Sequence, residues 1–243
     1  MLINERYDKI LNVLKQKRKV SVKELTALLF VSEATVRRDL TEMQKLGLIE
    51  RAHGCAVISN NTEEVSHFVR IDKNTKEKEY IASLALKRLP RFGTVFLDGS
   101  STAVALAERM NLEHKTVVTY NLQTAMQISK KPNVNLIILG GVVHYSTASA
   151  IGSWTASQIN DFYFDLFISS CSAISNQEIY ENSLEQKIIK QNALNKSTFK
   201  ILLADHTKFE STPVYKSSNS SDYSLIVTDK KPVNFGAFNN LIY

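Results

Sequence analysis

The sequence has few cysteines and no long apolar run. Its two cysteines, Cys55 and Cys171, stand alone in 243 residues, too few for a disulfide framework and not spaced for a zinc site. No apolar stretch approaches the roughly 20 residues of a membrane-spanning helix. The first residues, Met1-Leu2-Ile3-Asn4-Glu5-Arg6, contain no apolar segment of a secretory signal. These absences predict a cytoplasmic protein without a membrane segment, a metal site or a disulfide.

The composition is that of an ordinary globular protein. Hydrophobic residues make up 44% of the chain and charged residues 22%, so a sizeable core is available. A chain of 243 residues is long enough for two domains, or for one large α/β domain with an appendage.

Positive charge is concentrated near the N-terminus. Residues 1–60 contain 11 Lys and Arg against 7 Asp and Glu, a net charge of +4, whereas residues 61–243 contain 19 against 17, a net charge of +2. This asymmetry favours a small basic module that meets a polyanion. The basic run Lys17-Arg18-Lys19 by itself is better explained as a solvated turn.

Residues 32–47 have the pattern of a single helix. Ser32 is a good N-cap, and Gly47 can end the helix because it adopts left-handed backbone angles without a Cβ penalty. Between them Val36, Leu40 and Met43 recur at the spacing of one buried helical face.

The remaining side chains of this helix suit contact with DNA. Glu33, Ala34 and Thr35 are small or able to form hydrogen bonds, and small residues let a helix approach a surface closely. Arg37 and Arg38 follow, and an arginine presents a fork of donors to phosphate or guanine. We interpret the segment as a DNA recognition helix; an amphipathic surface helix is the alternative that the segment alone leaves open.

The neighbouring segments complete a winged helix-turn-helix. Residues 4–16 have helical spacing, and Ser21 with Glu24 forms a capping box before a second helix over 22–29. The short turn that follows places the third helix as the major-groove reader. Residues 48–58 form two β-prone segments around a glycine-bearing turn, which predicts a hairpin wing. From this wing Arg51 and His53 could touch the phosphate backbone or the minor groove.

Three stretches within residues 5–57 closely resemble the N-terminal domain of the DeoR family of bacterial transcription regulators. They are Ser21-Val22-Lys23-Glu24-Leu25, Val31-Ser32-Glu33-Ala34-Thr35-Val36-Arg37-Arg38-Asp39-Leu40 and Gly47-Leu48-Ile49-Glu50-Arg51-Ala52-His53-Gly54. Cys55 stands where that family usually has a second glycine. The resemblance implies that Thr35, Arg37 and Arg38 read DNA, while Asp39 orients an arginine or caps locally. The expected DNA-binding set is Ser32, Glu33, Ala34, Thr35, Arg37, Arg38, Arg51 and His53.

After a polar, non-periodic stretch the pattern changes to alternating helices and short apolar strands. We therefore expect a DNA-binding domain over 1–58, a linker over 59–67 and a larger domain over 68–243. Apolar strands are predicted near 95–97, 117–119, 136–139, 166–168, 201–203 and 225–227. Strands of this kind with crossover helices predict an α/β fold with a mainly parallel sheet, covered on both faces.

Polar residues follow several of these strands. Parallel sheets bind ligands outside the carboxyl ends of their strands. Asp98-Gly99-Ser100-Ser101-Thr102 lies between a strand and a helix N-terminus, where free amide groups and the helix dipole favour an anion such as phosphate. Thr119-Tyr120-Asn121, Gly140-Gly141 and Asp205-His206-Thr207-Lys208 occupy the corresponding ends. Each of them singly could be no more than a capped turn.

In the same order, these segments resemble the sensor domain of DeoR regulators, whose fold is similar to sugar-phosphate isomerases. The resemblance implies an effector site for a phosphorylated sugar. This sequence departs from the family at Tyr120 and in the glycine-poor segment 169–175. Farther along, Glu185, Lys187 and Lys190 could lie over the site, although pairs on a helix surface are the simpler interpretation. The expected effector-binding set is Asp98, Gly99, Ser100, Ser101, Thr102, Thr119, Asn121, Gly140, Gly141, Asp205 and Lys208.

The resemblance and the charge pattern predict a repressor of a sugar uptake or catabolism operon. It would bind a double-stranded DNA operator as a homo-oligomer, a dimer or a tetramer, and would need no cofactor. The alternative from another class is a sugar-phosphate isomerase with a DNA-binding appendage, which would need a base close to the substrate carbon. A winged helix that serves only protein–protein contact is disfavoured by Arg37 and Arg38.

Overall fold

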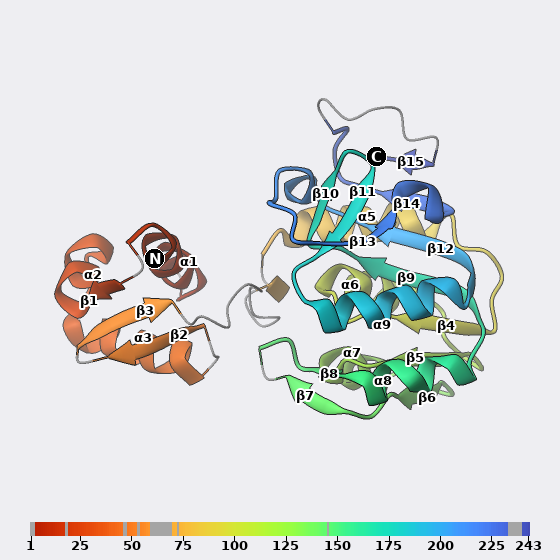
Figure 1. Cartoon of the computed structure of the whole chain (residues 1–243), viewed down its shortest axis with the longest axis horizontal. Helices are drawn as coiled ribbons and strands as arrows, with labels where there is room; N and C mark the ends of the chain where they lie inside the picture. Colours follow the sequence, from red (N-terminus) through yellow and green to blue (C-terminus); the bar gives the residue numbers. More distant parts are fainter. Residues whose placement is uncertain are drawn as a thin grey trace. The chain divides into compact units, whose positions relative to one another are not determined.

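The computed structural model describes residues 3–17, 19–45, 48–52, 54–58, 70–71, 73–144, 146–232 and 240–243. The chain divides into two compact units, one from residues 1–73 with 145–147 and the other from the remainder. Each unit is described by itself (Figure 1). No helix in these ranges is long and apolar enough to cross a membrane.

The first unit consists of three helices and a small antiparallel sheet. The helices are α1 (Ile3–Lys17), α2 (Val22–Leu29) and α3 (Glu33–Lys45). The strands β1 (Lys19–Ser21), β2 (Ile49–Ala52) and β3 (Cys55–Ile58) pair in the order β1-β3-β2. The structure confirms the predicted helices and the hairpin wing. It adds β1, which at three residues is too short to show an alternating pattern.

Local signals at the helix ends explain where α2 and α3 begin. Ser21 Oγ accepts a hydrogen bond from Glu24 N at 3.2 Å, and Ser21 N donates to Glu24 Oε2 at 2.8 Å, so the predicted capping box is present. These bonds hold the pKa of Glu24 below its ordinary value. Phe30 ends α2 in the left-handed conformation, with φ of 53° and a side chain that is 93% exposed. Gly47, the predicted end of α3, lies outside the described residues.

One apolar core joins the helices of this unit to its sheet. Val36, Leu40 and Met43 of α3 are fully buried, as their spacing predicts. Each fully buried side chain of this size contributes roughly 1.5–3 kcal/mol. The core is made of Tyr7, Ile10, Leu11, Leu14, Val20, Val22, Leu25, Leu29, Val36, Leu40, Met43, Leu48, Ile49 and Ala56.

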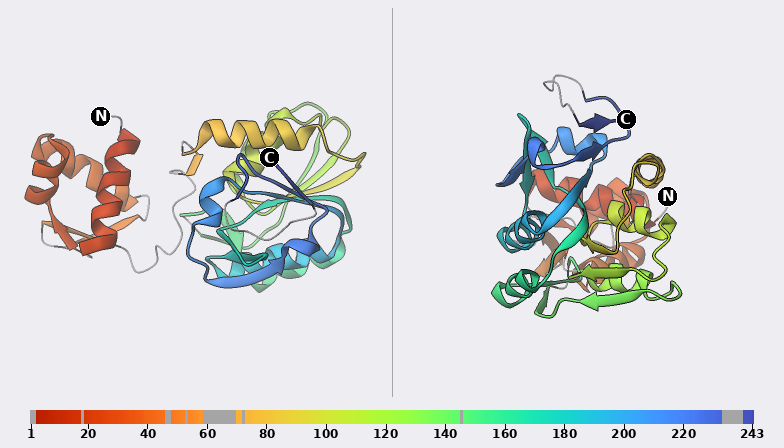
Figure 2. Two further views of the ribbon diagram at one scale, coloured as in Figure 1. Left: turned by 90° about the horizontal axis from the view of Figure 1, so that it is seen from above. Right: turned by 90° about the vertical axis from the view of Figure 1, so that its right-hand side faces the viewer.

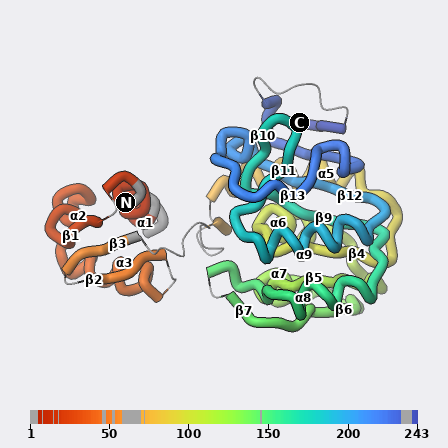
Figure 3. The backbone as a smooth tube through the Cα atoms, viewed as in Figure 1, coloured from red at the N-terminus to blue at the C-terminus, as the bar shows by residue number. Residues whose placement is uncertain are grey.

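The second unit is built on a seven-stranded sheet with the order β15-β14-β12-β9-β4-β5-β6. Every pairing in it is parallel, which confirms the predicted sheet. The backbone runs from β4 outward to β6 and returns to β9 on the other side of β4 (Figure 3). Its strands are β4 (Thr94–Leu97), β5 (Thr116–Thr119), β6 (Asn135–Ile138), β9 (Phe164–Ser170), β12 (Ser197–Leu203), β14 (Leu225–Val227) and β15 (Leu241–Ile242).

Helices cover both faces of this sheet, because its strands are apolar on both sides. Val95 and Leu97 pack in a core with α5 and α6, whereas Phe96 between them packs in a second core with α8 and α9. Figure 2 shows α5 on one side of the strands and α8 and α9 on the other. The helices are α5 (Thr75–Leu86), α6 (Ser101–Arg109), α7 (Leu122–Ile128), α8 (Ser153–Gln158) and α9 (Leu184–Asn195).

Two smaller sheets were not predicted. A hairpin of β7 (Val142–His144) and β8 (Ser149–Ile151) follows β6, and β10 (Ala173–Ser175), β11 (Glu178–Glu181) and β13 (Tyr215–Asn219) form an antiparallel sheet. Three-residue turns η1 (Ile159–Asp161) and η3 (Ser220–Asp222) and the four-residue η2 (His206–Phe209) complete the unit. These strands are short and partly polar, so their sequences carry no clear period of two.

Candidate functional site

The outer face of α3 presents the side chains that the sequence predicts for DNA contact. Ser32 caps the helix, because its Oγ accepts a hydrogen bond from Thr35 N at 3.2 Å. Glu33 and Arg37 form an ion pair at 3.3 Å, with both side chains about half exposed. Ala34 and Arg38 are also exposed. The arginines are therefore held by the helix and remain accessible.

The wing strand β2 is connected to this face. Arg51 Nη1 donates to Thr41 Oγ1 of α3 at 2.9 Å, so Arg51 stands beside the predicted reading face. His53, the other predicted wing contact, lies outside the described residues.

Asp39 points into the unit rather than toward the reading face. Its carboxylate accepts two hydrogen bonds from Arg6 of α1, from Nε at 2.6 Å and from Nη2 at 3.0 Å, and both residues are buried. The hydrogen bond from Arg6 to Asp39 raises the pKa of the guanidinium despite burial. The prediction that Asp39 orients an arginine holds, but that arginine comes from α1. The pair thus locks α3 against the first helix.

At the carboxyl edge of the large sheet, Asp98 is fully buried and its carboxylate faces inward. Oδ1 accepts a hydrogen bond from Ser100 N at 2.9 Å. Oδ2 accepts from Ser169 Oγ at 2.8 Å and from Ser170 N at 3.0 Å. Asp98 therefore fastens the loop after β4 to the end of β9.

Lys190 of α9 supplies the countercharge. Its Nζ lies 3.2 Å from Asp98 Oδ2 and 2.9 Å from Glu181 Oε1, and it donates to Ser170 O at 3.0 Å. Burial alone would raise the pKa of Asp98, but Lys190 and the hydrogen bonds hold it below its ordinary value. Burial would lower the pKa of Lys190, and Glu181 and Asp98 raise it well above its ordinary value. Asp98 and Lys190 are thus both charged at neutral pH. The expectation of a surface pair for Lys190 was wrong, because its side chain is only 11% exposed.

The loop after β5 lies directly against the loop after β4. A Cβ on Gly99 would come within 2.8 Å of Asn121 Nδ2, so only glycine fits there without a shift. Asn121 caps α7 by accepting from Thr124 N at 2.9 Å, and its Nδ2 donates to Ser149 Oγ at 3.0 Å. Thr119 Oγ1 accepts from Asn121 N at 3.3 Å. Loops 98–102 and 119–121 therefore form one continuous polar edge.

The N-terminus of α6 opens this edge. Ser100 is its N-cap, with Oγ accepting from Ala103 N at 3.1 Å. Ser101 is partly exposed and Thr102 is buried. The helix dipole and the first-turn amides favour an anion here.

The glycines after β6 have a packing role. Gly140 O accepts from Thr155 Oγ1 at 2.9 Å and from Gln158 Nε2 at 2.9 Å. A Cβ on Gly141 would come within 2.0 Å of Thr155 Oγ1. The close approach of α8 thus explains the glycine at 141, whereas a Cβ on Gly140 would meet no atom nearer than 3.9 Å.

Asp205 and Lys208 follow β12, which pairs with β9 on the side away from β4. Asp205 caps η2, with Oδ1 accepting from Thr207 N at 3.1 Å and from Asn74 Nδ2 at 3.4 Å. The charges of Asp205 and Lys208 both act on Cys171, the residue after β9, whose pKa is raised mainly by burial. Lys208 therefore places a positive charge at the end of the polar edge that follows β12.

Comparison with known proteins decides the family. The DeoR C terminal sensor domain matches residues 73–230, and the DeoR-like helix-turn-helix domain matches residues 6–62. The chain belongs to the DeoR family of transcription regulators. The HTH-type transcriptional regulator GolR of Listeria innocua is 34% identical over 235 residues, which cover 93% of this chain and 91% of GolR. The glycerol-3-phosphate regulon repressor of Escherichia coli is 30% identical over 94% of this chain and 91% of its own length.

A solved ribose 5 phosphate isomerase A from Neisseria gonorrhoeae is a more distant likeness. It is 12% identical and covers 55% of this chain and 53% of its own, with a TM-score of 0.40. A likeness of this degree carries no argument about the DeoR sensor domain.

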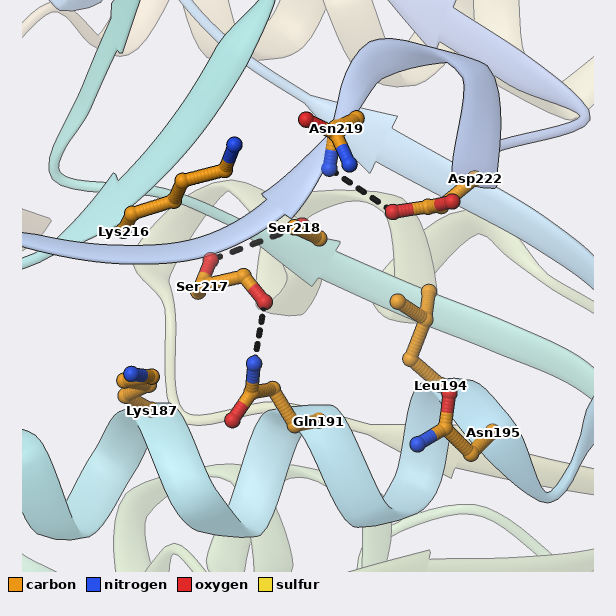
Figure 4. Close-up of a pocket in the computed structure, with 9 residues that line it drawn as sticks. All are labelled: Lys187, Gln191, Leu194, Asn195, Lys216, Ser217, Ser218, Asn219 and Asp222. Atoms are coloured by element: carbon orange, nitrogen blue, oxygen red, sulfur yellow. Dashed lines mark hydrogen bonds between the residues drawn. The ribbon is translucent and has the colours of Figure 1, made fainter.

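The sensor domain also has a surface pocket of about 530 Å³ between α9 and β13. Gln191 Nε2 donates across it to Ser217 O at 2.5 Å (Figure 4). Lys216, on its rim, pairs with Glu178, and Asp222 accepts from Asn219 N at 2.7 Å. The pocket includes none of the residues predicted for the effector.

Sequence reasoning missed two residues of the polar edge, Glu181 and Ser169, and left Lys190 as the less favoured of two possibilities. Lys190 had a usable signal, because Gln186, Ile189 and Ala193 define the buried face of α9 and Lys190 belongs to that face by helical spacing. Glu181 ends a strand that the pattern did not reveal. Among the described residues, no group of three or more His, Cys, Asp and Glu side chains could hold a metal ion.

Proposed function

We propose that this DeoR-family protein is a DNA-binding repressor of a sugar uptake or catabolism operon, and that a phosphorylated sugar modulates its operator binding. The observation that carries the proposal is the accessible face of α3, where a capped recognition helix presents Arg37 and Arg38 beside Arg51 of the wing. That the relatives include HTH-type regulators and a regulon repressor supports the same conclusion.

The roles of the DNA-binding residues follow from their chemistry. Arg37 and Arg38 can donate to guanine O6 and N7 or to phosphate, and a good bidentate contact is worth roughly 1–3 kcal/mol of discrimination against the wrong base. Thr35 and Ala34 allow close approach of the helix to the groove. Phosphate contacts from the basic module make the affinity salt-dependent.

For the effector we propose the edge formed by loops 98–102 and 119–121, with Lys208 as the cation on its far side. The N-terminus of α6 suits a phosphate, and Ser101 offers a hydroxyl there. Asp98 organises the loop and does not meet the ligand, because its carboxylate is inward and neutralised by Lys190. The buried carboxylate therefore repels a bound anion less than an unpaired one would. Thr119, Asn121 and Asp205 are also buried, so in this proposal they meet hydroxyls of a sugar only where the ligand enters between the loops that they hold.

Regulation then requires that the sugar phosphate bind two arrangements of the protein with different affinity. In the proposal, a dimer or tetramer places its recognition helices in successive major grooves of a repeated operator. The effector favours an arrangement of the DNA-binding domains that no longer fits that spacing.

The isomerase alternative is less well supported by the same edge. Asp98 would be the nearest candidate for a base, but it is fully buried, and both of its oxygens are engaged, Oδ1 by Ser100 N and Oδ2 by Ser169, Ser170 and Lys190. A base must reach the proton on the substrate carbon. Assays of aldose–ketose interconversion with pentose and hexose phosphates would reveal turnover if this alternative were correct.

The DNA-binding half is tested by fluorescence anisotropy of labelled DNA from upstream of the protein's own operon, against non-specific DNA at fixed salt. Arg37→Ala and Arg38→Ala should each weaken specific binding by roughly tenfold or more. Arg88→Ala, which removes an exposed arginine from the sensor domain, is the control and should bind like the wild type. Equal binding by all three variants would refute the assigned reading face.

The effector half is tested on the same complex by titrating a panel of sugar phosphates. One of them should change operator affinity in the wild type, and Lys208→Ala should shift that response to higher ligand concentration without altering operator binding. Specific DNA binding that no phosphorylated sugar alters would refute the effector half alone.

A further inference from the structure

Residues 116–160 of the sensor domain are almost free of charge. This stretch of 45 residues contains only Lys130 and Lys131 among Asp, Glu, Lys and Arg, although such residues make up 22% of the chain. The depletion is not confined to buried positions. Apart from Lys130 and His144, every described residue that is exposed in this stretch is apolar or uncharged and polar. Water-facing segments of soluble proteins are ordinarily rich in charge.

Large apolar side chains are exposed in the same stretch. Val142 is 77% exposed, Trp154 70% and Met126 60%. Ile138, Val143 and Leu122 are exposed to a lesser degree. We refer to these six as the edge surface: Leu122, Met126, Ile138, Val142, Val143 and Trp154.

The edge surface surrounds β6, the last strand of the large sheet on that side. Among the described strands, β6 pairs only with β5. Leu122 and Met126 are one turn apart on α7, which covers one face of the sheet there. Trp154 is on α8, which covers the other, and its Nε1 would lie 3.9 Å from a Cβ on Gly140, just beyond β6. The exposed apolar groups therefore come from both helical layers and from the hairpin that follows the strand.

We propose that the edge surface is the site at which two copies of this chain associate. Depletion of charge together with exposed Trp, Met and aliphatic side chains is the composition of the core of a protein–protein interface. Exposed apolar groups gathered around one strand are typical of a protein–protein contact. DNA is not the occupant, because the surface lacks the clustered cations that a polyanion requires.

A second copy fits this surface better than an unrelated partner. An open sheet edge is self-complementary about a two-fold axis, because two identical strands that meet side by side in antiparallel fashion are related by that axis. This pairing of two strands requires no charged side chain and leaves no charged side chain without a partner. The six side chains expose on the order of several hundred Å², a large part of the roughly 800 Å² per partner that a standard interface buries.

The test is the mass of the full-length protein in solution, by sedimentation equilibrium over a range of concentrations. The chain has a mass of 27.4 kDa, and the wild type should sediment as a dimer or a multiple of it. Met126→Lys and Ile138→Lys should each weaken the association that the edge surface makes by at least about thirtyfold, the effect of losing a hot-spot residue. Met126 is on a helix surface, so its substitution leaves the sheet intact.

Ile188→Lys is the matched control. Ile188 on α9 is 42% exposed, close to the 47% of Ile138. In contrast to Ile138, it has charged neighbours on its own helix, namely Glu185, Lys187 and Lys190. The Ile188→Lys variant should associate like the wild type. A monomeric wild type, unchanged association in both edge-surface variants, or equal weakening by Ile188→Lys would each overturn the proposal. A tetramer that the edge-surface variants reduce to dimers supports it.

Discussion

Replacing Lys190 with methionine tests whether the buried ionic cluster is as tightly coupled as its geometry indicates. The ammonium of Lys190 contacts Asp98, Glu181 and the carbonyl of Ser170 within 3.2 Å. Methionine keeps the length and the apolar part of the side chain but removes the charge. The Asp98 and Glu181 carboxylates, whose side chains are 0% and 3% exposed, would then lose the ammonium that both of them contact.

Removing one partner from a buried ion pair costs about 3–5 kcal/mol. For a domain of 150–250 residues, each kcal/mol lowers Tm by roughly 2–4 °C, so Lys190→Met should lower the Tm of the sensor domain by roughly 6–20 °C at pH 7. Neutralising a carboxylate at the same time, as in Lys190→Met with Glu181→Gln, should recover part of the loss.

The pH dependence should reverse as well. In the wild type the pKa of Asp98 is depressed, so its contribution to stability is present above the unfolded value and is lost as pH falls through the folded pKa. The pKa of Lys190 is raised, so its contribution is fully present below its unfolded value and does not change between pH 5 and 8. In Lys190→Met, burial raises the carboxylate pKa values, and stability should fall as pH rises. The difference between variant and wild type should therefore shrink from pH 8 to pH 5.

Thermal unfolding of the full chain by far-ultraviolet circular dichroism at several pH values measures both quantities. Lys187→Met is the control, because Lys187 is on the same helix one turn earlier and has no buried partner charge among the described contacts; it should lie within about 0.5 kcal/mol of the wild type. A loss below about 1 kcal/mol, or a deficit that does not change with pH, would refute the reasoning.

Two further predictions concern the DNA-binding domain. Asp39→Ala removes both hydrogen bonds that the buried Arg6 guanidinium donates to Asp39 and should destabilise that domain by about 3–5 kcal/mol in urea unfolding. Glu42→Ala, which removes an exposed pair with Lys45, should cost under about 1 kcal/mol. Similar losses for the two variants would contradict the buried pairing. Phe30→Gly should be about 1 kcal/mol more stable than Phe30→Ala, because the left-handed backbone at this position penalises any Cβ. Alanine is normally the more stable of the two at helical positions, and that order here would count against the explanation.

Much of the fold could be predicted because its signals are local. The capping box at Ser21, the cap at Ser32 and the cap at Asn121 each depend on residues within three positions, and all three are present. Strands buried on both faces are continuous apolar runs, so the parallel sheet was predicted as well. The strands of the smaller sheets were missed because they are short and half polar.

The polar edge was predicted only in part, because its central contacts join distant segments. Asp98 follows β4 whereas its partner Lys190 is on α9, and nothing near Asp98 in the sequence indicates that partner. Asp39 shows the same limit. A local argument indicated an arginine partner, but Arg6, 33 positions away, becomes its neighbour only when α1 packs on α3.

Trp154 is the only tryptophan in the chain, and it stands 70% exposed beside β6 and far in sequence from the recognition helix. All tryptophan emission of the protein therefore originates from one sensor-domain surface, and the recognition helix contributes no indole signal of its own. An emission change on adding operator DNA to the unlabelled protein would thus arise from the surroundings of a sensor-domain residue. The chain carries, without any dye, an optical reporter at one end of its sheet.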